Sequence, residues 1–239
     1  MPSDKPHACP GTWLASCNLR KGRDALSLLR AEPVDAAACA ETRRIQVIFD
    51  GVLQNRHELI GALELAPEAS DALVAAKAYE RWGEEFVLKL KGIFAVAVWD
   101  RANETLWCAR DPLGTYPLYY SEAGGELLLS TCVDELIRHP AVPRTVNRAA
   151  LADRLLYRWP DPEELYYEKV RRVFPGNLMR VDRSGRHSAR YWDPLAPGRS
   201  VNWIREEELG RFDELFAEAV RFCLSFGPAG IFLSGGLDS

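Results

Sequence analysis

The sequence predicts an α+β fold in which two stacked, mainly antiparallel sheets carry helices on their outer faces. The run GIFAVAVWD (92–100) is an unbroken apolar strand, which requires cover on both faces. The run TLWCAR (105–110) follows a short polar turn and therefore predicts its hairpin partner. PLYYSEAGGELLLST (117–131) predicts a second hairpin around a Gly-Gly turn. Hairpins interleaved with helices favour a four-layer sandwich between about Gln46 and Tyr191.

The remaining elements of this region follow from local patterns. A Ser side chain before an apolar helical pattern can accept the free N–H groups of the first turn, so Ser70 is expected to begin a helix. ALSLLRA (25–31) fits a strand and a helix equally well, which leaves the first 40 residues open. The other expected elements are a strand over 44–51, a helix over 57–65, a helix from Ser70 to Gly83 and a short helix over 84–91.

Composition limits the class of protein. The 239 residues are 47% hydrophobic and 27% charged, which suits one large domain or one domain plus part of another. The net charge of -4 gives no basic surface for nucleic acid or membrane lipid. No apolar run approaches the ~20 residues of a membrane span, and the N-terminal residues do not resemble a signal peptide. We therefore expect a cytoplasmic protein without a nucleic-acid or membrane partner.

Cysteine and histidine spacing gives no metal or disulfide signature. No two cysteines have C-x-x-C spacing, and no histidine has a partner at ligand spacing. Reduced, buried thiols are the expected state. The cysteines are residues 9, 17, 39, 108, 132 and 223, and the histidines are residues 7, 57, 139 and 187.

The composition and pattern of the sequence change after Tyr191. WDPLAPGRS (192–200) has the Pro, Gly and Ser content of a linker, and residues 205–224 form an amphipathic helical pattern. An apolar strand, Ala229 to Leu233, then leads into a glycine turn. We divide the chain into a first domain over 1–195, a linker over 196–205 and the start of a second domain over 206–239.

The terminal turn SGGLDS (234–239) has residues suited to phosphate. Gly235 and Gly236 let the backbone approach a phosphate closely, and Asp238 offers a carboxylate for Mg²⁺. The turn resembles the pyrophosphate-binding loop of the ATP pyrophosphatase superfamily, which implies ATP contacts from Ser234, Gly235, Gly236, Leu237, Asp238 and Ser239. The alternative is a Gly-Gly turn between a strand and a helix without a ligand.

Four segments followed by this loop resemble the asparagine synthetase family from about Gln46 onward. RDPLG-x-x-PLYY is the most specific piece. The resemblance implies an N-terminal-nucleophile (Ntn) αββα domain that releases ammonia from glutamine, followed by an α/β domain that adenylates aspartate. It also implies ATP and Mg as cofactors of the intact protein. The segments are GIFAVAVWD, CARDPLGTYPLYY, STCVDELIRHPAV and FPGNLMRVDRSG.

The first domain departs from the family where the resemblance places catalysis. Active members have a cysteine directly after the initiating Met, but this chain has Pro2. Asp50-Gly51-Val52 stands where the family reads Asn-Gly-Glu. An ionised Asp50 cannot donate to a developing oxyanion, and Val52 offers no carboxylate to glutamine. We expect no intact catalytic residue in the glutaminase site.

Part of the family's glutamine site remains. Gly51 is retained, and the pair Ser70-Asp71 resembles the binder of the substrate amine. Processing that exposes Cys9 or Cys17 as a nucleophile is an open alternative, although neither is followed by the family's Gly-Ile.

The degenerate site resembles branches such as β-lactam synthetases and lasso-peptide cyclases. We therefore expect part of an ATP-dependent, amide-forming ligase that adenylates a small-molecule or peptide carboxylate. Its partner would be a homodimer mate or a precursor peptide. One alternative is an active glutamine-hydrolysing asparagine synthase, and another is a non-catalytic module that binds a peptide or a protein. Because the chain ends at Ser239, we also expect residues after about Gly227 to be frayed and Mg-ATP binding to be no tighter than millimolar.

Overall fold

The computed structural model describes residues 12–32, 38–158, 161, 163–194, 206–224, 230 and 234–236. The chain divides into two compact units, residues 1–194 and 195–239. Helix α6 (Glu206–Leu224) belongs to the second unit, and all the other described elements belong to the first.

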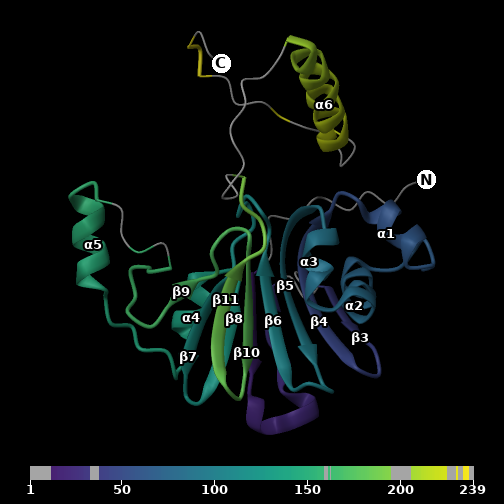
Figure 1. The fold of residues 1–239 in the computed structure, drawn as a ribbon. Helices are drawn as coiled ribbons and strands as arrows, with labels where there is room; N and C mark the ends of the chain where they lie inside the picture. Colours follow the sequence, from purple (N-terminus) through teal and green to yellow (C-terminus); the bar gives the residue numbers. More distant parts are fainter. Residues whose placement is uncertain are drawn as a thin grey trace. The chain divides into compact units, whose positions relative to one another are not determined.

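The first unit contains two sheets in which every strand pairing among the described residues is antiparallel (Figure 1). The five-stranded sheet has the order β2-β1-β8-β7-β9, and the six-stranded sheet has the order β11-β10-β6-β5-β4-β3. The strands of the first sheet are β1 (Thr12–Cys17), β2 (Leu26–Glu32), β7 (Tyr119–Ala123), β8 (Glu126–Ser130) and β9 (Arg171–Arg172). Those of the second are β3 (Ala38–Glu41), β4 (Ile45–Leu53), β5 (Gly92–Asp100), β6 (Thr105–Arg110), β10 (Asn177–Asp182) and β11 (Gly185–Arg190).

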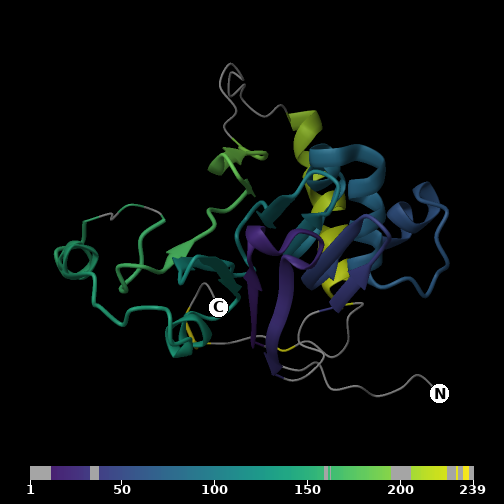
Figure 2. The same ribbon diagram turned by 90° about the horizontal axis from the view of Figure 1, so that it is seen from below.

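Helices lie on the outer faces of the two sheets. Helix α2 packs on β4 and β3 of the six-stranded sheet, and α4 packs on β8 and β1 of the other sheet (Figures 1 and 2). The helices and 3-10 turns are η1 (Leu19–Asp24), α1 (Arg56–Ala62), α2 (Asp71–Trp82), η2 (Gly83–Glu85), α3 (Phe86–Lys89), α4 (Val133–Arg138) and α5 (Arg148–Leu155).

Three apolar clusters hold these layers together. Along β4, Val47 and Phe49 face the helical layer with α2, whereas Ile48 faces the other sheet. The cluster between the sheets contains Trp13 of β1 and Trp99 of β5, both fully buried. A third, smaller cluster joins α4 to the five-stranded sheet. The order is therefore helix, sheet, sheet, helix, as the alternation of strand residues requires.

The strongest sequence signals gave the right elements. The 92–100 strand, its hairpin with 105–110 and the Gly124-Gly125 hairpin are all present, and every residue of β5 after Ile93 is buried. Helix α2 begins after Ser70, whose hydroxyl accepts from the Leu73 N–H, and it ends at Gly83. These parts of the α+β prediction are confirmed.

The N-terminal part of the sandwich extends further than expected. The sheets begin at Thr12 rather than near Gln46, because β1 lies between β2 and β8 and pairs with both. The ambiguous ALSLLRA run is part of strand β2. The expected helix over 84–91 is a 3-10 turn followed by a single helical turn that ends at Lys89.

In the second unit, the predicted amphipathic pattern forms a 19-residue helix, α6. The expected strand over 229–233 lies outside the described residues, apart from Gly230. No helix in the described part of the chain is long and apolar enough to cross a membrane. The apolar stripe of α6 is exposed and consists of Leu209, Phe212, Leu215, Phe216 and Val220.

Candidate functional site

Asp50 lies between the two sheets, near the end of β4. It follows Ile48 on the same face of the strand, and its register partner in β5 is Ala95. Only 6% of Asp50 is exposed. A carboxyl group at such a position needs hydrogen-bond donors, because leaving it unpaired costs several kcal/mol.

Two aromatic side chains provide these donors. The Trp13 indole Nε1 donates to Asp50 Oδ2 at 2.8 Å, and the Tyr116 hydroxyl donates to Oδ1 at 2.6 Å. Burial raises the pKa of Asp50 to about 6, while the bonds from Tyr116, Trp13 and the Gly51 backbone oppose this rise. Each carboxyl oxygen thus has a donor from the protein itself, and the group has no N–H to offer an oxyanion.

The loop between β6 and β7 holds Tyr116 in place. Asp111 is buried, and its carboxylate accepts from the backbone N–H groups of Thr115 and Tyr116 at 3.0 and 2.7 Å. The Arg110 guanidinium donates to the backbone carbonyls of Tyr116 and Gly114 in the same turn. The RDPLG segment therefore orients the phenol that contacts Asp50.

Gly51 has a packing role that accounts for its residue type. Its φ is +128°, and a Cβ at this position would lie 2.1 Å from the carbonyl oxygen of Ile93 in the neighbouring strand. No side chain fits there without moving the β4–β5 backbone. Val52 comes next and is 41% exposed beside its register partner Ile93. The Val52 side chain carries no charge with which to bind a ligand.

Asp71 lies at the same end of β4 and is already paired. Its Oδ2 accepts from the backbone N–H of Leu53 at 3.2 Å, and its Oδ1 forms an ion pair with the Arg56 guanidinium. Arg56 also donates to the carbonyl oxygens of Pro67 and Ala69. Ser70 is exposed and caps α2 through its hydroxyl. The carboxylate that resembles the binder of a substrate amine is thus neutralised by a cation of the same chain.

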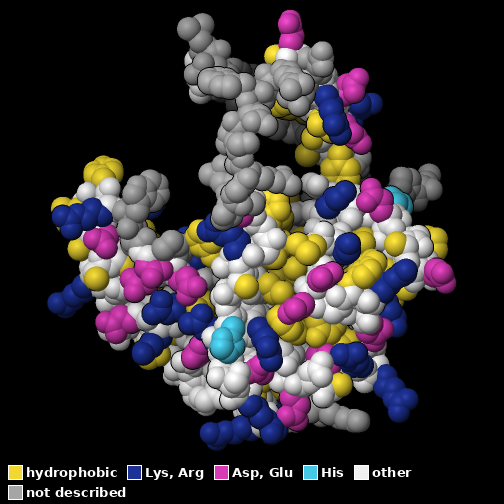
Figure 3. All heavy atoms as spheres, viewed as in Figure 1, with side chains coloured by type: hydrophobic (Ala, Val, Ile, Leu, Met, Phe, Trp, Pro, Cys, Tyr) yellow, Lys and Arg dark blue, Asp and Glu magenta, His cyan; other side chains and the backbone are white. Residues whose placement is uncertain are grey.

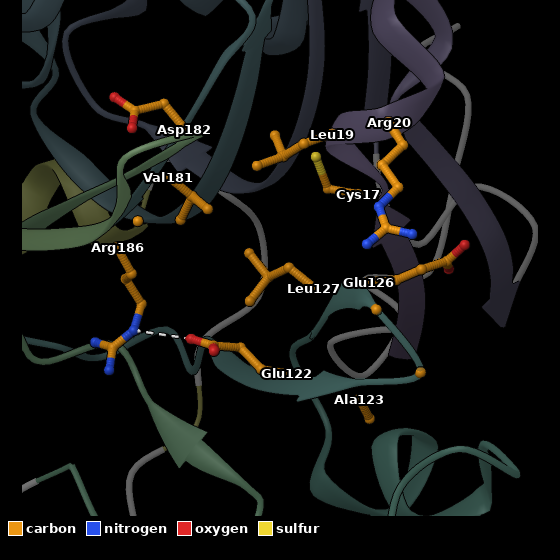
Figure 4. A pocket seen from close by; sticks show the side chains of 13 residues that line it. Cys17, Leu19, Arg20, Glu122, Ala123, Glu126, Leu127, Val181, Asp182 and Arg186 are labelled. Carbon is orange, nitrogen blue, oxygen red and sulfur yellow. Dashed lines mark hydrogen bonds and ion pairs between the residues drawn. The ribbon is translucent and has the colours of Figure 1, made fainter.

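A cavity lies at the other end of the apolar cluster between the sheets. Cys17 ends β1 and lines a cavity of about 440 Å³ together with Leu19, Leu127 and Val181 (Figure 4). Charged side chains border it, and Figure 4 shows Arg186 donating to Glu122, at 3.1 Å.

The Cys17 thiol in this cavity is poorly ionised. Burial, with a smaller contribution from Glu126, raises its pKa to about 12. Because the thiolate is the attacking form, Cys17 is not an activated nucleophile. No group of three or more His, Cys, Asp or Glu side chains able to hold a metal occurs among the described residues.

The remaining sequence-predicted residues lie in the second unit or outside the described residues. Ser234, Gly235 and Gly236 belong to the second unit, where Gly235 has a φ of +80° and the Gly236 N–H donates to Ser234 Oγ at 3.3 Å. Pro2, Cys9, Leu237, Asp238 and Ser239 lie outside the described residues.

Sequence reasoning missed the three side chains that close the site. Trp13 lies in the segment whose structure was left open, and Tyr116 had no role assigned from the sequence. Arg56 follows β4 at the start of a helix and carries no motif. The only available signal was the position of Tyr116 within RDPLG-x-x-PLYY, next to the segments that carry the family resemblance.

Comparison with known proteins identifies the domain. A model of the glutamine amidotransferase domain matches residues 11–192. Asparagine synthetase (glutamine-hydrolyzing) 3 of Bacillus subtilis is 30% identical over 81% of this chain and 32% of its own length. Asparagine synthetase (glutamine-hydrolyzing) 2 of the same organism is 31% identical over 83% of this chain and 28% of its own length. Amidase chyE of Penicillium rubens is 30% identical over 71% and 25%.

These relatives are much longer than the chain, which spans about a third of their length or less. The match begins at residue 11, close to the start of β1, and therefore includes the N-terminal strands that the resemblance from Gln46 did not reach. The chain belongs to the glutamine amidotransferase domain family, and its first unit is a domain of the asparagine synthetase type.

Proposed function

We propose that this chain is part of an ATP-dependent amide-forming ligase whose glutaminase-like domain does not hydrolyse glutamine. The enclosure of Asp50 by Trp13 and Tyr116 is the observation that carries this proposal. Amide hydrolysis builds negative charge on the carbonyl oxygen, which needs preorganised donors. At this position the domain instead presents a carboxyl group whose oxygens are both occupied. Above pH 6 that group carries a negative charge, which repels an oxyanion.

The state of Asp71 supports the same proposal. Free glutamine carries an ammonium group, and a carboxylate that recognises it must be available for pairing. Arg56 holds Asp71 at the end of β4 and would repel the ammonium. Two separate requirements for glutamine, the oxyanion donor and the amine acceptor, are thus unmet in the same region.

ATP is the cofactor that the second unit would use. The left-handed φ of Gly235 fits a phosphate cradle, because it turns successive backbone N–H groups toward one side. We propose that residues 234–239 hold the phosphates and that Asp238 holds Mg²⁺. ATP supplies an activated carboxyl group on the substrate, which an amine then attacks. The substrate would be a small-molecule or peptide carboxylate.

The names of the relatives favour one other function. Two of them are called glutamine-hydrolyzing asparagine synthetases, so an active amidotransferase that supplies ammonia to aspartate is the second candidate. It requires that glutamine displace the internal partners of Asp50 and Asp71.

Product formation from different amine donors distinguishes these functions. The intact ligase that contains this chain is incubated with Mg-ATP, a panel of carboxylates and either hydroxylamine or glutamine, and pyrophosphate and amide or hydroxamate are measured. Turnover with hydroxylamine that is lost in Asp238→Ala, and no turnover with glutamine, is the expected result. Turnover with glutamine as nitrogen donor would support the amidotransferase. Retention of a carboxylate-bearing peptide without any turnover would support a non-catalytic binding module.

A further inference from the structure

Helix α5 stands apart from the sandwich of the first unit. Figures 1 and 2 show it at the end of an excursion between α4 and β9. Two backbone bonds close the base of this excursion, from the Asn147 N–H to the Tyr166 carbonyl at 2.8 Å and from the Glu168 N–H to the Thr145 carbonyl at 3.0 Å. Because a helix of eight residues is marginal in water, α5 depends on packing for stability.

Most of the apolar surface of this helix faces solvent. Of its residues only Ala150 is buried, whereas Leu155 is 71% exposed. Leu156 and Tyr157 follow directly and are 62% and 95% exposed. Leu151 lies one turn before Leu155 on the same face and is 39% exposed. Contiguous exposure of large apolar side chains at this level is typical of an interaction surface.

Helix α5 ends in a hydrogen-bonded cap at Tyr157. Tyr157 has a φ of +54°, a left-handed conformation that is unfavourable for a bulky residue. The Tyr157 N–H donates to the Arg154 carbonyl at 3.3 Å, and the Arg158 N–H donates to that of Asp153 at 2.8 Å. These two bonds are those of a Schellman C-cap, which ends the helix at Leu155 and fixes the backbone of Leu156 and Tyr157.

Three arginines lie on α5 or directly after it, among its apolar side chains, whereas the returning segment 161–168 carries four acidic residues. Residues 144–158 contain four arginines and one aspartate. Arg148, Arg154 and Arg158 form no ion pair with any residue that the structure describes. Figure 3 shows Lys and Arg atoms beside hydrophobic atoms in this region. The nearby acidic Glu164 accepts from Asn147 at the base of the excursion.

We propose that the α5 face, defined as Leu151, Leu155, Leu156 and Tyr157 with Arg148, Arg154 and Arg158, docks an acidic amphipathic helix of a partner protein. Apolar residues of that helix cover the leucines, and its carboxylates pair with the three arginines. A second copy of the chain is disfavoured, because two α5 faces would bring arginines of like charge together.

Two matched synthetic peptides test this proposal. Both are amphipathic helices with leucine at the same positions, and their polar face carries glutamate in one and lysine in the other. Each is labelled with fluorescein and titrated with the full chain by fluorescence anisotropy. The glutamate peptide is expected to bind at least tenfold more tightly than the lysine peptide, with an affinity that falls as salt is raised.

Substitutions on the α5 face locate the binding. Leu155→Ser with Leu156→Ser is expected to weaken binding of the glutamate peptide at least tenfold, and Arg154→Glu with Arg158→Glu is expected to reverse the peptide preference. Leu88→Ser is the matched control, because Leu88 is 56% exposed on α3, and it should leave binding unchanged. Helix α6 of the same chain is itself acidic and amphipathic and is therefore a competitor of the glutamate peptide. The titration is repeated with an α6 variant that carries Phe212→Ser and Phe216→Ser, which removes most of the apolar stripe of this helix.

Three results would overturn the proposal. One is no binding of the glutamate peptide to either the native chain or the α6 variant. Another is equal binding of the two peptides, which indicates a generally adhesive surface. The third is sedimentation that shows a dimer of the chain that Leu155→Ser with Leu156→Ser dissociates, because a second copy would then be the occupant.

Discussion

The region between the two sheets differs at the two ends of strand β1, because a carboxyl group is enclosed at one end and a thiol lines a cavity at the other. At one end, the Asp50 carboxyl is enclosed by Trp13 and Tyr116 and has a pKa of about 6. At the other end, the Cys17 thiol lines a cavity of about 440 Å³ and has a pKa of about 12. Strand β1 contributes to both ends, since it begins beside Trp13 and ends at Cys17.

This difference supports the proposal that the domain has the family fold but does not hydrolyse glutamine. Covalent amide hydrolysis needs an open site, an ionisable nucleophile and donors for the oxyanion at one place. At the Asp50 end both carboxyl oxygens already accept hydrogen bonds from the chain, and at the Cys17 end the thiol stays protonated. The proposal agrees with the general rule that a fold can be retained without its activity.

Removal of Trp13, at the Asp50 end, should give the largest loss of stability. Trp13→Ala leaves a cavity in the inter-sheet cluster and removes one donor of Asp50, so the free energy of unfolding should fall by about 3–5 kcal/mol. Urea unfolding followed by circular dichroism measures this change. Trp192→Ala is the control, since Trp192 is 38% exposed, and its loss should be much smaller. Equal losses in the two variants would contradict the enclosed-carboxyl account.

The pH dependence of stability should show the raised pKa of Asp50. Because the folded-state pKa of about 6 lies above the value of 3.8 for an unperturbed Asp, the folded chain binds the proton more tightly than the unfolded chain between these values. The contribution of Asp50 to stability should therefore fall by about 3 kcal/mol as pH rises through this window, with about half of the fall above pH 5.

Asp50→Asn isolates this contribution. Urea unfolding at pH 5 and at pH 7.5 should show that the variant lacks the fall attributed to Asp50. Asp213→Asn removes the same charge from the exposed face of α6 and should leave the pH dependence of the native chain. Parallel curves for Asp50→Asn and the native chain would show that Asp50 has an ordinary pKa.

The ion pair at Asp71 should have a smaller effect on stability. Arg56→Gln leaves the half-buried Asp71 with only the Leu53 N–H, and should reduce the free energy of unfolding by about 1 kcal/mol. Lys91→Gln is a matched control, because Lys91 pairs with Glu58 at 3.9 Å with both side chains about 70% exposed. Such an exposed pair contributes little. A loss no larger for Arg56→Gln than for Lys91→Gln would show that Asp71 is not held by Arg56.

Substitution of Cys17 should give the smallest effect, on the reaction of the chain's thiols with a reagent. Cys17→Ser should leave the fast phase of reaction with a disulfide reagent at pH 8 unchanged, since burial keeps Cys17 protonated. Cys223→Ser should remove one fast-reacting equivalent, because Cys223 is exposed on α6. Loss of a fast equivalent in Cys17→Ser would show that the cavity admits the reagent and that the thiol ionises.

Local signals predicted much of the fold. The apolar run of β5 and the Gly-Gly turn of the β7–β8 hairpin were sufficient to place four strands. Strand β1 was missed because TWLASC is short and has no turn signal of its own. Its pairing with β8 joins residues more than one hundred positions apart, which no local pattern contains.

The candidate site was predictable in position but not in state. The family resemblance placed Asp50 and Asp71 in one region, and both lie at the end of β4. Whether these carboxylates are free depends on Trp13, Tyr116 and Arg56, which reach them only in the folded chain. The raised pKa of Asp50 likewise arises from burial between sheets rather than from neighbouring residues in the sequence.

Glutamine hydrolysis is the most direct measurement of the central claim. The purified chain is incubated with glutamine at neutral pH, and glutamate release is compared with a protein-free blank. We expect release at the rate of the blank for the native chain and also for Asp50→Asn, since a side-chain amide at this position would not by itself supply a nucleophile. Release above the blank that Cys9→Ala or Cys17→Ala abolishes would contradict the account and show that this domain is a working glutaminase.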